Sequence, residues 1–116
     1  MGKKSKTKGK VGELEAAAKL SQLLDTKVER SQQYKGGQHS ADLAGTGRLH
    51  PEVKRTERLN LYDAMSQAAA DAGANNLPIV VHRRNRQPWL FICYLDDLTN
   101  VAQEVMRIRK GQTADK

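Results

Sequence analysis

The sequence predicts a single mixed α/β domain, on three observations. The chain has 116 residues, a length that suits one hydrophobic core and leaves no room for a second catalytic domain. Apolar residues recur at helical spacing in three segments, and short runs typical of strands lie between them. We therefore expect the order helix, three short strands, helix, two strands, helix, with a mixed central sheet of about five strands flanked by the helices.

A first helix is expected over residues 11–24, where alanines favour helix formation. Residues three, four and seven positions apart share one helical face. That face combines Glu13 with Ala17, Leu20 and Leu24. A carboxylate therefore lies on an otherwise apolar stripe, which makes Glu13 a candidate metal or water ligand. A carboxylate favoured by the helix dipole is the structural alternative.

The other two helices carry signals at their ends. The second is expected over residues 60–72, because Asn60 is a good N-cap. The third is capped by Asp96 or Asp97 and ends near Arg109. Its inner face is expected to hold Leu98, Val101, Val105 and Ile108.

Five strands are expected, over residues 27–33, 41–44, 49–55, 78–83 and 88–95. The second and third flank a Gly45-Thr46-Gly47 turn and are expected to pair as a hairpin. Pro51 lacks a backbone donor, which predicts an irregular or unpaired point in the third strand. The strand over 88–95 is the most apolar of all.

Both ends of the chain are polar. Residues 1–10 carry five lysines and almost nothing apolar, which predicts a flexible basic arm that aids solubility or contacts phosphates. Residues 110–116 are expected to be a disordered tail. A single domain is therefore expected over residues 11–109.

The balance of charge points to a polyanionic partner. Lys and Arg number 20 against 13 Asp and Glu, a net charge of +7. Nucleic acid is the first candidate, while a membrane surface is disfavoured because no basic helix carries bulky apolar residues. No apolar run is long enough to span a bilayer, and no secretory signal is present. The single Cys93 in an apolar run reads as a buried thiol, consistent with a cytoplasmic, intracellular setting.

One group of polar residues is a candidate catalytic site. In a strand, residues two positions apart point to the same side, so Glu52 and Lys54 share a face while Val53 points into the core. If the strands over 41–44 and 49–55 pair, Asp42 comes beside Glu52. Two carboxylates and one ammonium group would then meet at one place.

Cleavage of a phosphodiester needs such a set of groups. Mg²⁺ or Mn²⁺ prefers carboxylate oxygens and keeps several waters. Asp42 and Glu52 would hold the ion, with Glu13 and the Val53 carbonyl as further ligands. Lys54 would orient or deprotonate the attacking water, or stabilise the charge that develops on the phosphate.

These motifs resemble those of the PD-(D/E)xK nuclease superfamily, and in particular its small Holliday junction resolvases of archaeal and phage type. The residues that carry the likeness lie in three stretches: Lys8-Gly9-Lys10-Val11-Gly12-Glu13, Gly37-Gln38-His39-Ser40-Ala41-Asp42-Leu43 and Glu52-Val53-Lys54. The family's proline before the aspartate is Ala41 here, and the spacing from Asp42 to Glu52 is tight.

The resemblance implies a restriction-endonuclease-like core and a metal-dependent DNA endonuclease, which could be encoded by a phage. It implies a catalytic glutamine at Gln67, on the helix after the motif, although a solvated glutamine is the plainer reading. It also implies branched DNA such as a four-way junction as substrate, and a homodimer that cuts two strands.

Basic residues around this centre are candidates for contact with the DNA backbone. Arginines flank the motif and cluster again near the last predicted turn, which would make binding dependent on salt. Few aromatic residues are present, so recognition of backbone and shape is expected rather than base stacking. The candidates are Lys8, Lys10, Ser40, Arg48, Arg55, Arg58, Arg83, Arg84 and Arg86.

Two alternatives stay open at this stage. A nicking or restriction-like nuclease of the same fold would act on linear duplex DNA. A basic protein that binds nucleic acid without cutting it would share the charge but not the metal-dependent activity.

Overall fold

The computed structural model describes residues 2–31 and 41–111, with side chains from residue 9 onward within those ranges. The elements are α1 (Gly2–Leu24), β1 (Glu29–Arg30), β2 (Leu43–Ala44), β3 (Leu49–Arg55), α2 (Leu61–Ala72), β4 (Leu77–Arg83), β5 (Leu90–Cys93), the 3-10 turn η1 (Leu95–Asp97) and α3 (Leu98–Arg109). The mixed α/β class and the predicted order of helices and strands are confirmed.

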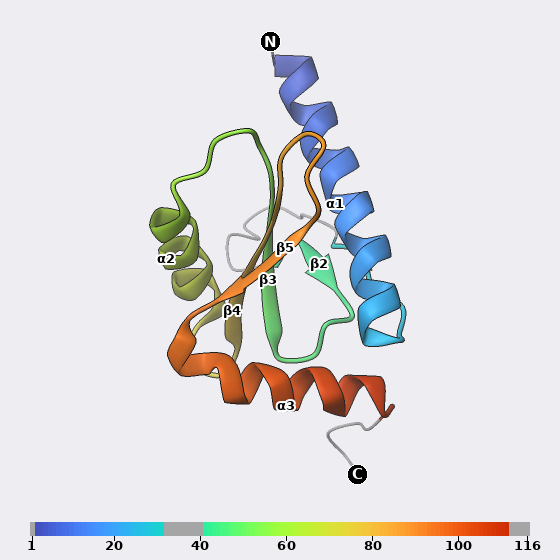
Figure 1. Ribbon diagram of the computed structural model, residues 1–116, viewed down its shortest axis with the longest axis vertical. Helices are drawn as coiled ribbons and strands as arrows, with labels where there is room; N and C mark the ends of the chain where they lie inside the picture. Colours follow the sequence, from blue (N-terminus) through green and yellow to red (C-terminus); the bar gives the residue numbers. More distant parts are fainter. Residues whose placement is uncertain (1, 32–40, 112–116) are drawn as a thin grey trace.

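The strands form a three-stranded sheet and a two-stranded ribbon. In the sheet, of order β3-β4-β5, β4 runs parallel to β3 and antiparallel to β5. Helix α2 connects the two parallel strands, as parallel pairing requires a crossover. Strands β1 and β2 pair antiparallel as the ribbon, and β2 lies along the outer side of β3 (Figure 1).

Helices cover both faces of the sheet, which gives three layers (Figure 1). Side chains of a strand alternate between the two faces. On β4, Ile79 and Val81 belong to a core with α1 and α3, whereas Val80 packs with α2 residues Ala68 and Met65. The two faces of β4 are therefore both apolar, as expected for a central strand.

The predicted second helix and third strand are confirmed. Strand β3 has the predicted bounds, and α2 begins directly after its N-cap Asn60. The Asn60 Oδ1 accepts a hydrogen bond from the Asp63 N–H at 3.1 Å. Helix α2 stops at Gly73, whose φ of 75° is accessible to glycine at little cost.

Helix α1 begins earlier than predicted. It starts at Gly2 rather than Val11, so the backbone of residues 2–10 is helical and continuous with the amphipathic segment. Lysines are good helix formers, and a helix already nucleated by packed residues is easily extended. The flexibility of this basic segment stays a prediction, and residues 112–116 of the predicted tail lie outside the described residues.

The last predicted strand is shorter and more exposed than its composition suggested. It extends only over Leu90–Cys93, because β4 is its one neighbour in the sheet and its other edge has no strand partner among the described residues. Leu90 is 53% exposed. Leu98, expected on the inner face of the last helix, is also exposed, while Val101 is buried.

The predicted hairpin and the predicted irregularity at Pro51 both need correction. The strands over 41–44 and 49–55 do not form a regular hairpin: β2 pairs with β1, and a single backbone bond, Asp42 N–H to Pro51 O at 3.2 Å, links it to β3. Pro51 itself is regular and buried, in register with Ile79. Its missing donor faces β2 rather than β4, since the N and O of one strand residue point to the same edge.

None of the helices in the described part of the chain is long and apolar enough to cross a membrane.

Candidate active site

The outer edge of β3 is where the predicted catalytic residues meet. Asp42 directly precedes β2, and one of its carboxylate oxygens, Oδ2, accepts the Val53 N–H at 2.8 Å. The side chain thus takes the place of a strand partner for β3. Because N–H and C=O of one strand residue point to the same edge, the Val53 carbonyl faces the same side as the Asp42 carboxylate.

Glu52 lies on the face of β3 that α2 covers, in register with Val80. Its residue exposure is only 7%, and its carboxyl shares a hydrogen bond with Asp42. Burial, followed by the charge of Asp42, raises the pKa of Glu52 to about 7. The pair therefore holds either a proton or an external cation at neutral pH.

Asp42 is subject to opposing effects. Burial raises the pKa of its carboxyl, and the nearby charge of Glu13 acts in the same direction, while the hydrogen bond from the Val53 N–H lowers it. The net pKa is raised. A carboxylate already satisfied by a main-chain donor keeps a fixed orientation toward its neighbour.

Lys54 lies two residues after Glu52 and projects from the same face of β3. Its charge lowers the pKa values of both Asp42 and Glu52, which places the ammonium group within electrostatic reach of the two acids. The predicted meeting of Asp42, Glu52 and Lys54 is thus present in the structure, although pairing of β2 with β3 as a regular hairpin is not.

Glu13 approaches the same centre from α1. Its side chain is 19% exposed, and the apolar stripe below it (Ala17, Leu20 and Leu24) is buried as predicted. Glu13 Oε1 is ion-paired with Arg30 Nε of β1 at 2.5 Å. Nothing in the sequence pattern indicated Arg30, because a salt bridge between α1 and β1 leaves no periodic signal.

The donor set fits a divalent cation in part. Among the described residues, no three His, Cys, Asp or Glu side chains are arranged as they stand to enclose a metal ion. Two acids in contact with raised pKa values, beside a main-chain carbonyl at the edge of β3, nevertheless form a favourable site for a hard cation that keeps its waters. Asp42, Glu52 and the Val53 carbonyl would be the protein ligands, with Glu13 held at Arg30.

Gln67 lies on α2 with an exposed side chain. Asp71, one turn later on the same helical stripe, acts electrostatically on Glu52 and on His50. The approach of Gln67 to the active site stays a prediction.

His50 is a buried residue of this region whose burial the sequence pattern did not predict. It is 6% exposed, and its Nε2 has no hydrogen-bond partner among the described residues. Burial lowers the pKa of the imidazole, so the ring is neutral beside Glu52. A ring this deeply buried offers little surface for contact with DNA.

The turn between β2 and β3 is held by α3. Buried Glu104 accepts the Arg48 N–H at 2.8 Å, and its carboxylate is also bonded by Arg107. Gly47, with φ of 58°, lies against these groups: an added Cβ would approach Glu104 Oε2 to 2.2 Å. This contact holds the turn immediately before β3.

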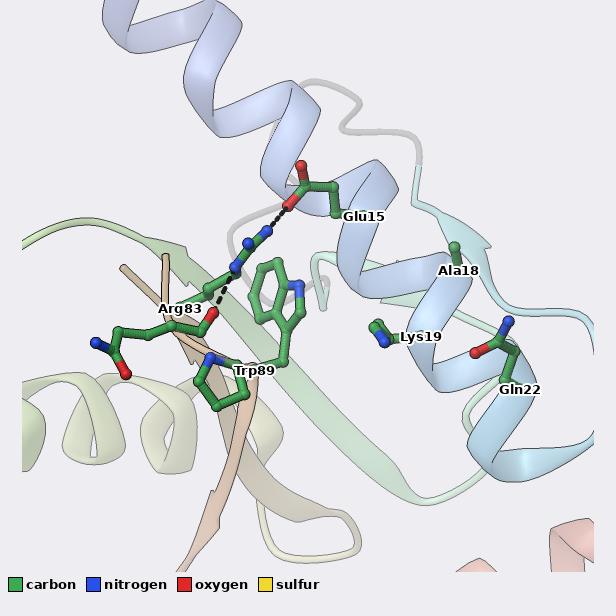
Figure 2. A pocket seen from close by; sticks show the side chains of 8 residues that line it. Glu15, Ala18, Lys19, Gln22, Arg83 and Trp89 are labelled. Atoms are coloured by element: carbon green, nitrogen blue, oxygen red, sulfur yellow. Dashed lines mark hydrogen bonds and ion pairs between the residues drawn. The ribbon is translucent and has the colours of Figure 1, made fainter. Parts of the chain in front are cut away.

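Three of the candidate DNA-binding arginines have partners inside the protein. Arg83 binds Glu15 Oε1 at 3.1 Å and the Gln87 carbonyl (Figure 2). Arg55 donates to the Asn85 side chain at 2.8 Å, and its side chain is only 14% exposed. Arg48 Nε donates to the Asn75 carbonyl at 3.0 Å.

Other basic candidates are exposed. Arg58, Arg84 and Arg86 lie on the surface, and Arg86 has a φ of 63° that only a tight turn explains. Lys10 is exposed on α1. Ser40 and the side chain of Lys8 lie outside the described residues. Contact of any of these with DNA stays a prediction.

Comparison with protein families identifies one match that spans almost the whole chain. A family model described as "Phage putative PDDEXK endonuclease" matches residues 4–113. No curated protein and no solved structure gives a significant match. The matched range contains the described fold apart from the first two residues of α1, and it contains all residues of the site above.

Proposed function

This chain belongs to the phage PD-(D/E)XK endonuclease family, and on that premise we propose that it is a Mg²⁺-dependent DNA endonuclease that acts on branched DNA. The single observation that carries the proposal is the contact of Asp42 with both Glu52 and the Val53 N–H at the outer edge of β3. A purely structural pair of acids would not be stabilising when buried together and raised in pKa.

The residues present divide the work of hydrolysis. Asp42, Glu52 and the Val53 carbonyl would hold the cation, Mg²⁺ or Mn²⁺, which lowers the pKa of a bound water and withdraws charge from the phosphate. With a cation bound, the Glu52 carboxyl would be in its ionised form. Lys54, on the same face, donates hydrogen bonds that orient the attacking water and stabilise the phosphate as negative charge develops.

Glu13 contributes by position. Its carboxylate lies near Asp42 and is bonded to Arg30, so it would act as a positioning group at the edge of the metal centre. Gln67, which is exposed on α2 one turn before Asp71, would bind a water of the substrate complex. Both roles are part of the proposal.

The branched substrate is proposed from the resemblance to Holliday junction resolvases, and the assembly is proposed from that substrate and the single centre. One chain offers one set of Asp42, Glu52 and Lys54, so paired cuts in a four-way junction require two copies. A homodimer on branched DNA is therefore proposed, with the net charge of +7 favouring contact with the phosphates.

The deciding experiment compares cleavage of a four-way junction, a flap and a linear duplex at fixed salt with Mg²⁺. Asp42→Asn, Glu52→Gln and Lys54→Ala are expected to lose cleavage while they retain DNA binding, with Glu29→Gln as a matched exposed control. Equal cutting of linear duplex would replace the branched substrate by a nicking or restriction-like activity. Loss of binding in all three variants, or no cleavage by the wild type with Mg²⁺ or Mn²⁺, would favour a basic binding protein instead.

A further inference from the structure

A groove lies between the segment after β3 and the β4–β5 hairpin. Its volume is about 540 Å³, within the range of cavities that hold small organic ligands. Its apolar wall is formed by Leu59, Leu61, Leu90 and Ile92. Two of these are exposed, with Leu61 at 38% and Leu90 at 53%.

The groove is positively charged at its rim. Arg58 and Arg84 line it and are exposed. Glu57, which also lines it, is paired with Arg55 at 3.6 Å and accepts the Asn85 N–H, and Arg83 is paired with Glu15. The remaining charge at the rim is therefore that of two arginines, which complements a phosphate.

The groove lies beside the proposed catalytic lysine. His82, which lines it, is the register partner of Lys54 in the parallel ladder, so the two side chains project from the same face of the sheet. His82 Nε2 is also within 3.0 Å of the Thr56 carbonyl, which ties β4 to the segment that forms the opposite wall. A DNA strand held at Lys54 would therefore run close to the groove.

From these relationships we propose that the groove binds the base of one unpaired nucleotide of the DNA strand that is cut, with its phosphate on Arg58 and Arg84. This rests on the proposed nuclease function and gives it a substrate class: DNA with unpaired nucleotides next to the cleavage site. A base within a duplex must first be unstacked and unpaired at a cost in free energy, whereas an unpaired base can enter the groove without that cost. Aliphatic side chains and the His82 ring offer the base a surface in place of its neighbours in the stack.

The test uses the Lys54→Ala protein with Mg²⁺, so that binding is read without cleavage. One probe is a duplex with a single unpaired 2-aminopurine, and the other is the same duplex fully paired. We expect the unpaired probe to bind about tenfold more tightly and to change its fluorescence on binding. Equal affinity for the two probes overturns the proposal.

Two neighbouring substitutions at the start of α2 locate the effect. Leu61→Asp places a carboxylate in the groove, whereas Tyr62→Asp places one on the adjacent exposed residue outside it. Both acids lie in the first turn of α2, where they favour the helix, so both proteins should fold. The proposal is supported if Leu61→Asp loses the tenfold preference for the unpaired probe while Tyr62→Asp keeps it. The proposal is overturned if Leu61→Asp keeps this preference. A wild type that fails to cut but keeps the preference refutes only the nuclease function.

Discussion

The Asp42 carboxylate bonds the Val53 N–H at 2.8 Å while it is also in contact with Glu52. One side chain therefore closes the open edge of β3 and completes the acidic pair. Structure and chemistry are combined in a single residue, and substitutions of Asp42 can separate them.

We expect Asp42→Asn and Asp42→Ala to differ in stability but not in activity. Asparagine retains an oxygen that accepts the Val53 N–H, whereas alanine leaves this N–H without its partner, a difference of about 1–2 kcal/mol. Urea unfolding of the metal-free proteins at pH 8 measures the difference, and cleavage assays should show both variants inactive. Equal stability of the two variants would show that water replaces the carboxylate at no cost.

Glu52 predicts an unusual pH dependence of stability. Its pKa is about 7 in the folded protein and near 4.5 when unfolded. Between these two pH values the folded state therefore binds a proton that the unfolded state has released. The free energy of unfolding of the metal-free protein should therefore fall as pH rises from about 4.5 to 7, by about 3 kcal/mol at most. Asp42, also raised in pKa, acts in the same direction.

The measurement is thermal unfolding of the wild type and Glu52→Gln across this pH window, with and without Mg²⁺. Glutamine removes the titration, so its slope should be smaller and its stability at pH 8 greater than that of the wild type. Mg²⁺ should stabilise the wild type at pH 8 and not the variant. A wild-type stability that rises with pH would contradict the raised pKa of Glu52.

Gly12 lies where helix α1 closely approaches strand β3. A Cβ at this position would lie 2.5 Å from Arg55 Cβ, so Gly12→Ala should destabilise the protein by about 1–3 kcal/mol. Gly9 is the matched control, because nothing lies within 4 Å of its added Cβ and alanine favours the helix. Gly9→Ala should be neutral or stabilising; the same loss in both variants would exclude the contact as the cause.

Glu104 is expected to control activity from outside the active site. Glu104→Ala removes the acceptor of the Arg48 N–H and should cost about 2–3 kcal/mol. The loosened turn should also lower the rate of cleavage without loss of DNA affinity. Gln103→Ala, the exposed neighbour, serves as control; an unaltered rate in stable Glu104→Ala protein would mean that the turn does not position Asp42.

Exposed arginines and arginines with partners inside the protein should respond differently to substitution. Arg86→Ala, at an exposed position, should lower the slope of log K against log salt by about 1 and leave stability unchanged. Arg55→Ala should lower the melting temperature, because its guanidinium links Glu15, Glu57 and Asn85. Fluorescence anisotropy at several salt concentrations and thermal unfolding separate the two.

Much of this arrangement could be predicted from the sequence. Alternation along a strand places Glu52 and Lys54 on one face, and the helical period places Glu13 on the α1 stripe, because both depend on local geometry. The structure confirms both placements.

The rest depends on contacts between distant segments, which local patterns do not encode. Arg30 pairs with Glu13 across 17 positions, and Glu104 bonds Arg48 across 56. Charge alone also did not distinguish Arg55 and Arg83, which are committed to internal partners, from exposed Arg84. The apolar composition of β5 predicted burial, whereas its position at the sheet edge leaves it half-exposed.

The bond between Arg48 and Glu104 has a consequence for a chain still being synthesised. Asp42, Glu52 and Lys54 leave the ribosome well before Glu104, the group that fixes the turn between β2 and β3. A growing chain that already displays the proposed catalytic residues therefore lacks the contact that holds the turn before β3. On the proposed function, we expect cleavage activity to appear only after the last helix has docked.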